Sequence, residues 1–159
     1  MRYVKQKDQY SCGPIAIMNA LKWAGLQTTY KTHFHRIRTL FKTTMSWGTT
    51  IDNMTATLLK HGRYLSFTTK SLVTLKEIDR HLAQGGAVIL KYWFKESAGY
   101  DGHYVFLFRE EGHDFIAVNA MLGTPAAQPC PRDMLKSMLS CKKYRHTGSP
   151  SAWFITRNE

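Results

Sequence analysis

One cysteine near the start of the chain stands where a reactive thiol is expected. Cys12 is followed by Gly13 and then by an apolar run at helical spacing that ends at Gly25. The sequence therefore predicts a helix from about Gly13 to Ala24, with Cys12 at its N-terminus. Unpaired N–H groups and the positive end of the helix dipole stabilise a thiolate there. We expect the pKa of the Cys12 thiol to lie below its ordinary value, and we expect the thiolate to attack an acyl carbon.

A cysteine at a helix start is often only a small buried apolar residue, so the other polar residues of the chain matter. Gln6 lies six residues before Cys12, and its amide could donate to the oxyanion that forms on an attacked carbonyl. Gly102-His103 follows far downstream, and Asn119 comes sixteen residues after His103. A nucleophile, a base and a residue that orients the base identify a catalytic site only together.

The two downstream residues belong to a predicted hairpin. The segments 103–108 (HYVFLF) and 114–119 (DFIAVN) alternate as strands do, and a polar turn containing Gly112 joins them. His103 opens the first predicted strand and Asn119 closes the second. Antiparallel pairing brings the two residues to the same end of the sheet, so we expect a hydrogen bond from the imidazole to the Asn119 side chain.

This pattern of residues resembles the papain-like cysteine peptidases. The match is to Gln6-x5-Cys12-Gly13, then Gly102-His103, then Asn119. It is strongest with the C39-like group, typified by bacterial domains that cut leader peptides after a double glycine. C39-like proteins commonly carry Asp, often followed by Pro, at the third position, where this chain has Asn119. We expect no transporter segment of the kind that accompanies the leader-cutting domains, so their substrate is not carried over.

The resemblance implies a role for each matched residue. Cys12 would be the nucleophile, His103 the general base and acid, Asn119 the residue that orients the imidazole, and Gln6 the oxyanion donor. Gly102 would lie in the substrate-binding region. The resemblance also implies a papain-like α+β fold that needs no metal or organic cofactor.

The remaining periodicity agrees with helices that lead and an antiparallel sheet that follows, all in one domain over residues 1–159. We predict helices over 30–42, from Thr49 or Thr50 to Lys60, and over 74–84 after a capping box of Thr74 and Glu77. Further strands are predicted over 63–71, 87–94 and 151–157. A Pro-rich loop over 123–131 and a short basic helix over 132–143 complete the chain.

Composition limits the class of protein and its partners. The 159 residues include 22 Lys and Arg against 11 Asp and Glu, which gives a formal charge of +11 and a pI near 9.7. Such an excess favours an anionic partner. Three cysteines without a CxxC pair argue against a disulfide framework and a zinc site. His33 and His35 have no further ligand nearby at metal-binding spacing. Without an apolar leader or an apolar run long enough to span a membrane, we expect a cytoplasmic protein.

The sequence therefore favours a cysteine peptidase that hydrolyses a peptide or isopeptide bond. The same chemistry on the same fold could instead serve a deamidase or an acyltransferase. A third hypothesis is a basic, non-catalytic protein that binds nucleic acid. We favour an acidic peptide or protein as the partner, because the sequence contains a complete acyl-transfer constellation and no recognised nucleic-acid motif.

Overall fold

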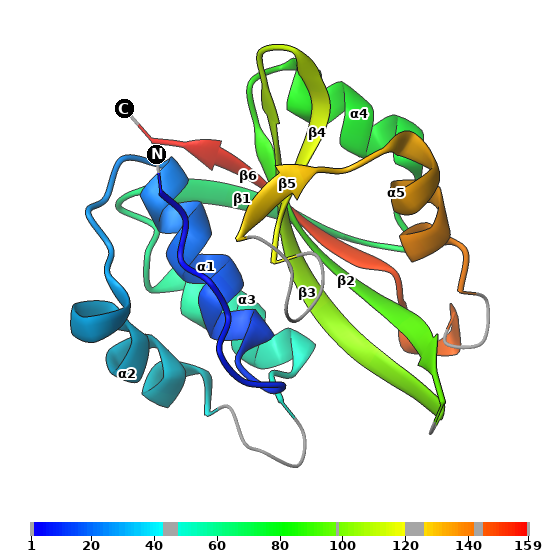
Figure 1. Ribbon diagram of the computed structural model, residues 1–159. Helices are drawn as coiled ribbons and strands as arrows, with labels where there is room; N and C mark the ends of the chain where they lie inside the picture. The colour runs from blue at the N-terminus through cyan, green and yellow to red at the C-terminus, as the bar shows by residue number, and fades with distance from the viewer. Residues whose placement is uncertain (1, 43–47, 98, 120–125, 142–144, 159) are drawn as a thin grey trace.

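The computed structural model describes residues 2–42, 48–97, 99–119, 126–141 and 145–158 (Figure 1). The described residues combine helices with a single antiparallel sheet, as the α+β prediction requires. The helices are α1 (Cys12–Trp23), α2 (Tyr30–Phe41), α3 (Ile51–Leu59), α4 (Leu75–Ala83) and α5 (Arg132–Leu139), with a short 3-10 turn at Arg145–Thr147. The strands are β1 (Leu65–Ser71), β2 (Ala87–Glu96), β3 (Gly99–Glu110), β4 (His113–Val118), β5 (Ala127–Pro129) and β6 (Ser151–Arg157).

The sheet has the strand order β1-β6-β2-β3-β4-β5, and each neighbouring pair is antiparallel. The C-terminal strand β6 lies between β1 and β2, so the predicted final strand does join the sheet. β2 and β3 form the longest hairpin, paired from Ala87 and Phe108 at one end to Glu96 and Gly99 at the other. This hairpin carries His103.

Helices cover both faces of the sheet. α1, α2 and α3 lie over one face, and α4 and α5 lie over the other (Figure 1). Side chains alternate along each strand, so a single strand serves two cores. On β2, Ile89 packs toward α1 and Leu90 toward α4 and α5. On β3, Phe106 and Leu107 divide in the same way.

Local sequence signals account for the helix starts. Thr74 and Glu77 form the predicted capping box at α4, and the Thr50 side chain accepts from the Asn53 N–H at the start of α3. α1 differs, because Ser11 at its N-cap makes no side-chain hydrogen bond to the helix. The first N–H groups of α1 are therefore left for other partners.

Several predicted boundaries are wrong. β3 begins at Gly99, four residues before His103, because β2 continues to Glu96 and holds the added residues in register. His103 therefore lies inside a strand. The predicted loop over 123–131 contains β5, which pairs with β4. The predicted helix over 132–143 ends at Leu139, and residues 142–144 lie outside the described part of the chain.

Membrane-spanning helices need both length and an apolar composition. None of the described helices is both long enough and apolar enough to cross a bilayer.

Candidate active site

Cys12 is the first residue of α1 and is only 6% exposed. The backbone N–H groups of Tyr104, Gly13 and Cys12 itself point toward the sulfur. The approach of α1 requires a glycine after the cysteine, because a Cβ at Gly13 would overlap the Thr49 side chain. The Gly that follows Cys12 in the sequence pattern thus has a packing role.

The contact with the Tyr104 N–H determines where the thiol lies relative to the sheet and along β3. A strand N–H points within the plane of the sheet, so a sulfur that accepts from it lies close to that plane. The described ladder between β3 and β4 ends at the pair Phe106 and Val118. The Cys12 thiol therefore lies beside β3 just past the end of this ladder, level with the residue that follows His103.

The expectation of a lowered thiol pKa is wrong. Burial raises the pKa of Cys12 to about 11, although the three N–H groups act in the opposite direction and the Asp101 carboxylate adds a smaller increase. The free-energy penalty of removing a thiolate from water exceeds the stabilisation that the N–H groups of the helix N-terminus provide. In the resting protein Cys12 is therefore a neutral thiol.

His103 is buried on β3, with its ring edge-on to Tyr92 and Phe94 at centroid distances of 5.8 and 6.4 Å. Its Nε2 lies 2.7 Å from the backbone oxygen of Asn119. A carbonyl oxygen only accepts, so Nε2 carries the proton and Nδ1 keeps a free lone pair. Burial lowers the pKa of His103 below its ordinary value, while the Asn119 carbonyl and Asp101 partly oppose this. The neutral ring can therefore accept a proton at Nδ1.

Asn119 meets His103 as the hairpin predicts, but through a different atom. The imidazole bonds to the main-chain carbonyl, whereas the side chain binds the N-terminal lead-in. Asn119 Oδ1 accepts from the Gln6 N–H at 2.8 Å, and Nδ2 donates to the Val4 oxygen at 2.8 Å. Asn119 has φ +54°, a left-handed conformation that Asn tolerates better than most residues. The prediction that the Asn119 side chain binds the imidazole is therefore wrong. Asn119 binds His103 through its main-chain carbonyl and Gln6 through its side chain.

A second asparagine, which the sequence did not reveal, also binds the N-terminal lead-in. Asn19 is fully buried in α1 and exchanges two hydrogen bonds with the Val4 backbone, at 2.7 and 3.0 Å. Val4 is thus held by Asn19 from the helix and by Asn119 from the end of β4. A polar residue within an otherwise apolar helix segment was the available signal, because a buried amide must find partners.

Gln6 lies two residues after Val4 and is 5% exposed. Its Nε2 donates to the Asp8 carbonyl at 2.6 Å, which occupies one of its two N–H groups. Its Oε1 is buried and has no hydrogen-bond partner among the described residues. The amide is therefore held in one orientation by Asp8, with one N–H left for another acceptor.

Cys12 and His103 approach β3 from its two faces. Cys12 belongs to the core under α1, while His103 contacts Tyr92 and Phe94 of the opposite core. Within the described residues no hydrogen bond joins the thiol to the imidazole. Catalytic hydrogen bonds are commonly long in the absence of substrate and tighten when it binds.

Gly102 lies next to His103 and faces an aromatic ring. A Cβ at this position would lie 3.3 Å from the Trp93 ring, and the Gly102 N–H donates to Asp101 Oδ1 at 2.7 Å. The glycine therefore allows the Trp93 ring to cover the strand beside the candidate site.

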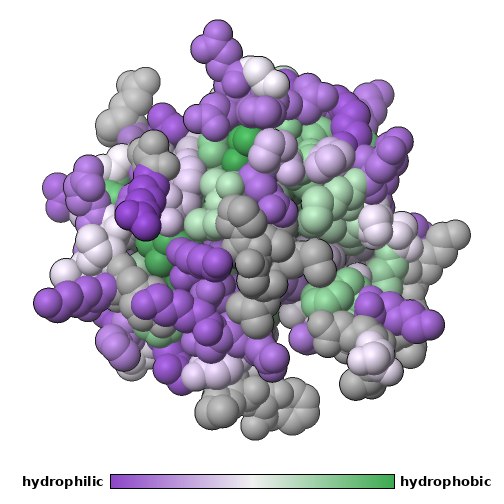
Figure 2. Space-filling model, viewed as in Figure 1, coloured by the Kyte–Doolittle hydropathy of each residue, from purple (hydrophilic) through white to green (hydrophobic). Residues whose placement is uncertain are grey.

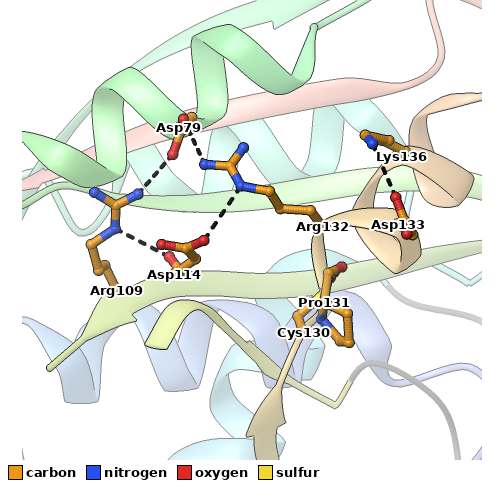
Figure 3. Close-up of polar contacts among 8 residues, drawn as sticks. All are labelled: Asp79, Arg109, Asp114, Cys130, Pro131, Arg132, Asp133 and Lys136. Carbon is orange, nitrogen blue, oxygen red and sulfur yellow. Dashed lines mark hydrogen bonds and ion pairs between the residues drawn. The ribbon is translucent and has the colours of Figure 1, made fainter. Parts of the chain in front are cut away.

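A separate groove of about 890 Å³ lies on the α4 and α5 side, lined in part by Arg109, Asp114, Cys130 and Arg132. Figure 3 shows that both arginines of this groove are paired: Asp79 bonds to Arg109 at 2.7 Å and to Arg132 at 3.0 Å, and Arg132 lies 3.3 Å from Asp114. Cys130 is buried there, and burial raises its pKa to about 11. The groove belongs to the core opposite the one that contains Cys12, and its paired arginines connect α4, α5 and the adjoining strands.

Comparisons with known proteins give a result for the fold alone. No protein-family model matches the sequence, and no curated protein matches it. Among solved structures, the chain is similar to the crystal structure of a "putative C39-like peptidase" from Bacillus anthracis, with a TM-score of 0.61 and 11% sequence identity. The match covers 99% of this chain and 95% of that one. The chain therefore has the fold of a C39-like peptidase, as the resemblance in sequence pattern implied.

Proposed function

We propose that this protein is a cysteine peptidase that hydrolyses a peptide or isopeptide bond, with residues 1–159 forming one catalytic domain. The observation that carries the proposal is the setting of Cys12 and His103. The thiol lies at the start of α1 beside the backbone of β3, and the Asn119 carbonyl fixes the imidazole tautomer with Nδ1 unprotonated. The fold, shared with a C39-like structure, supports the same reaction class.

In the proposed mechanism the reaction starts from a neutral pair. As substrate enters, His103 Nδ1 takes the thiol proton and the Cys12 sulfur adds to the carbonyl carbon. The oxyanion is stabilised by the backbone N–H groups at the start of α1 and by the remaining N–H of Gln6. His103 then protonates the leaving amine. It next removes a proton from water, which hydrolyses the thioester and frees Cys12.

The substrate that we propose is an acidic peptide or protein segment, because the chain carries a formal charge of +11. Opposite charge on a substrate speeds its encounter with the enzyme without changing the chemistry.

Labelling with a thiol-reactive electrophile tests this proposal, and the chain supplies its own control. Cys12 and Cys130 are 6% and 3% exposed, and burial raises both pKa values to about 11. Cys12 accepts from the backbone N–H of Tyr104, the residue that follows His103 on β3, and the proposal assigns His103 as its base. We expect Cys12 to be labelled at neutral pH much faster than Cys130, and His103→Ala to remove the difference. Equal labelling of the two thiols in the wild type would contradict a catalytic role for Cys12.

A further inference from the structure

Lys91 lies on the same face of the sheet as Cys12. It stands on β2 directly opposite Tyr104 of β3, two residues after the buried Ile89 that packs toward α1. Its Nζ is 5.5 Å from the centre of the Trp93 ring and 5.6 Å from that of Tyr104. Two aromatic faces thus hold the ammonium group in place over the strands.

The same contacts place Lys91 near the candidate nucleophile. Tyr104, which packs under the ammonium, is the residue whose N–H points at the Cys12 sulfur. Burial lowers the pKa of Lys91, and the charge of a Cys12 thiolate would act in the opposite direction. The ammonium is therefore partly desolvated and within electrostatic range of Cys12.

Lys91 has no carboxylate within ion-pair distance among the residues that the structure describes. Asp101 is the acidic residue whose charge reaches both Cys12 and His103. Its Oδ1, however, accepts from the Gly102 N–H at 2.7 Å. An ammonium that is partly removed from water is stabilised by an anion, and the described residues in contact with the Lys91 ammonium are aromatic. A ligand that carries an anionic group can therefore pair with the Lys91 ammonium.

We propose that Lys91 binds a carboxylate of the substrate next to the bond that Cys12 attacks, a role that rests on the proposed function. The carboxylate belongs to an acidic side chain or to a chain terminus. Trp93, which covers Gly102 beside Lys91, provides an apolar surface for the rest of that residue. Lys91 would thus set specificity for an acidic residue, and the chemistry would stay with Cys12 and His103.

Two alkylating agents that differ mainly in charge test this inference without a known substrate. Iodoacetate carries a carboxylate and iodoacetamide carries a neutral amide. With either reagent the sulfur forms a bond to the methylene carbon, iodide leaves, and the thiol proton passes to His103 or water. The measured quantity is the ratio of the two labelling rates at Cys12, followed by mass spectrometry. We expect iodoacetate to be favoured at Cys12 relative to a small free thiol.

Variants of two lysines on one strand separate a local effect from net charge. Lys91→Gln should lower the iodoacetate preference about tenfold, the factor expected for one charge-assisted hydrogen bond. Lys91→Arg should preserve the preference. Lys95 lies on the same face of β2 but is exposed, so Lys95→Gln should leave the ratio unchanged. Circular dichroism verifies that each variant is folded. In the wild type, the preference should also weaken as salt is raised, a test that needs no variant.

The absolute rates and their ratio report on different claims. Slow labelling of Cys12 that equals labelling of Cys130 contradicts the proposed peptidase, whatever the ratio. An iodoacetate preference that is absent in the wild type, or that survives Lys91→Gln, overturns the inference about Lys91. Rapid Cys12 labelling with that second result would leave the peptidase proposal intact.

Discussion

The two helical layers of this protein differ in how they use charge. Residues 1–64, which supply α1, α2 and α3, contain ten Lys and Arg but only two acidic residues. Residues 65–159 contain twelve basic and nine acidic residues. Ion pairs are found on this second side, such as those of Asp79 with Arg109 and Arg132. Figure 2 shows hydrophilic side chains gathered over the N-terminal lead-in and α2.

The difference indicates what each layer contributes. Around α4 and α5, carboxylates pair with arginines of neighbouring elements. Asp79 of α4, for example, forms ion pairs with Arg109 of β3 and Arg132 of α5. In the α1 layer Asp8 is occupied by the N–H groups of Tyr10 and Ser11, and Asp52 lies in the first turn of α3. Residues 1–64 thus contain eight more basic than acidic side chains. That excess lies in the segment that includes the helix carrying Cys12, and we propose that it attracts an anionic substrate.

The largest expected contrast between the layers comes from their two buried cysteines. Cys12→Ala should abolish hydrolysis of a substrate, because no other group forms the thioester. Cys130→Ala, equally buried under the opposite layer, should retain full activity. Each variant should lower the free energy of unfolding by only about 1 kcal/mol, since one buried sulfur is lost. Turnover and thermal denaturation measure the two effects, and wild-type turnover in Cys12→Ala would refute the assignment of the nucleophile.

A smaller effect is expected at Asn119, where the layers meet. Asn119→Ala keeps the main-chain carbonyl that binds His103 but loses the side-chain bonds to Gln6 and Val4. We expect it to cost about 1–3 kcal/mol of stability, the range for buried groups left unpaired. Labelling of Cys12 should fall far less than in His103→Ala. Equal loss of labelling in the two variants would mean that the side chain, as first expected, orients the imidazole.

The sequence was informative for features that local patterning determines and misleading where tertiary packing decides. Helical and alternating periods predicted the helices, the hairpin and the capping box of Thr74 and Glu77. The spacing of His103 and Asn119 correctly indicated a contact. Spacing could not reveal that the carbonyl makes this contact, because that depends on the left-handed backbone of Asn119. It also could not reveal the burial that raises the pKa of Cys12, since desolvation depends on the residues packed around the thiol.

A modest effect should follow from neutralising the basic layer. Replacing Lys31, Arg36, Arg38 and Lys42 with Gln should slow association with an acidic substrate several-fold and weaken the salt dependence of kcat/KM, with kcat unchanged. Replacing Lys76 and Lys136 on the opposite side provides the control and should have little effect. Tight nucleic-acid binding at physiological salt without peptidase activity, with log affinity falling linearly against log salt, would instead favour the nucleic-acid hypothesis.

The smallest expected effect lies in the ion pairs of the second layer. Hydrogen bonds and charge from Arg132, followed by those from Arg109, hold the pKa of Asp79 below its ordinary value. The carboxylate therefore stabilises the folded state above about pH 4, and this contribution is lost as pH falls through the lowered pKa. Asp79→Asn should cost no more than about 1 kcal/mol at pH 7, because the group is partly exposed, and should leave Cys12 labelling unchanged. Denaturant unfolding at pH 7 and pH 3 measures this, and a variant that lost activity at full stability would contradict a structural role.

If His103 activates a neutral thiol at Cys12, the pH dependence of Cys12 alkylation must show it. In the wild type we expect the rate to rise through the lowered pKa of His103, below about 6.5, and then to stay nearly level through neutral pH. In His103→Ala the rate should be much lower at pH 7 and should climb about tenfold per pH unit toward the thiol pKa of about 11. Identical profiles for the two proteins would show that the imidazole takes no part in activating Cys12.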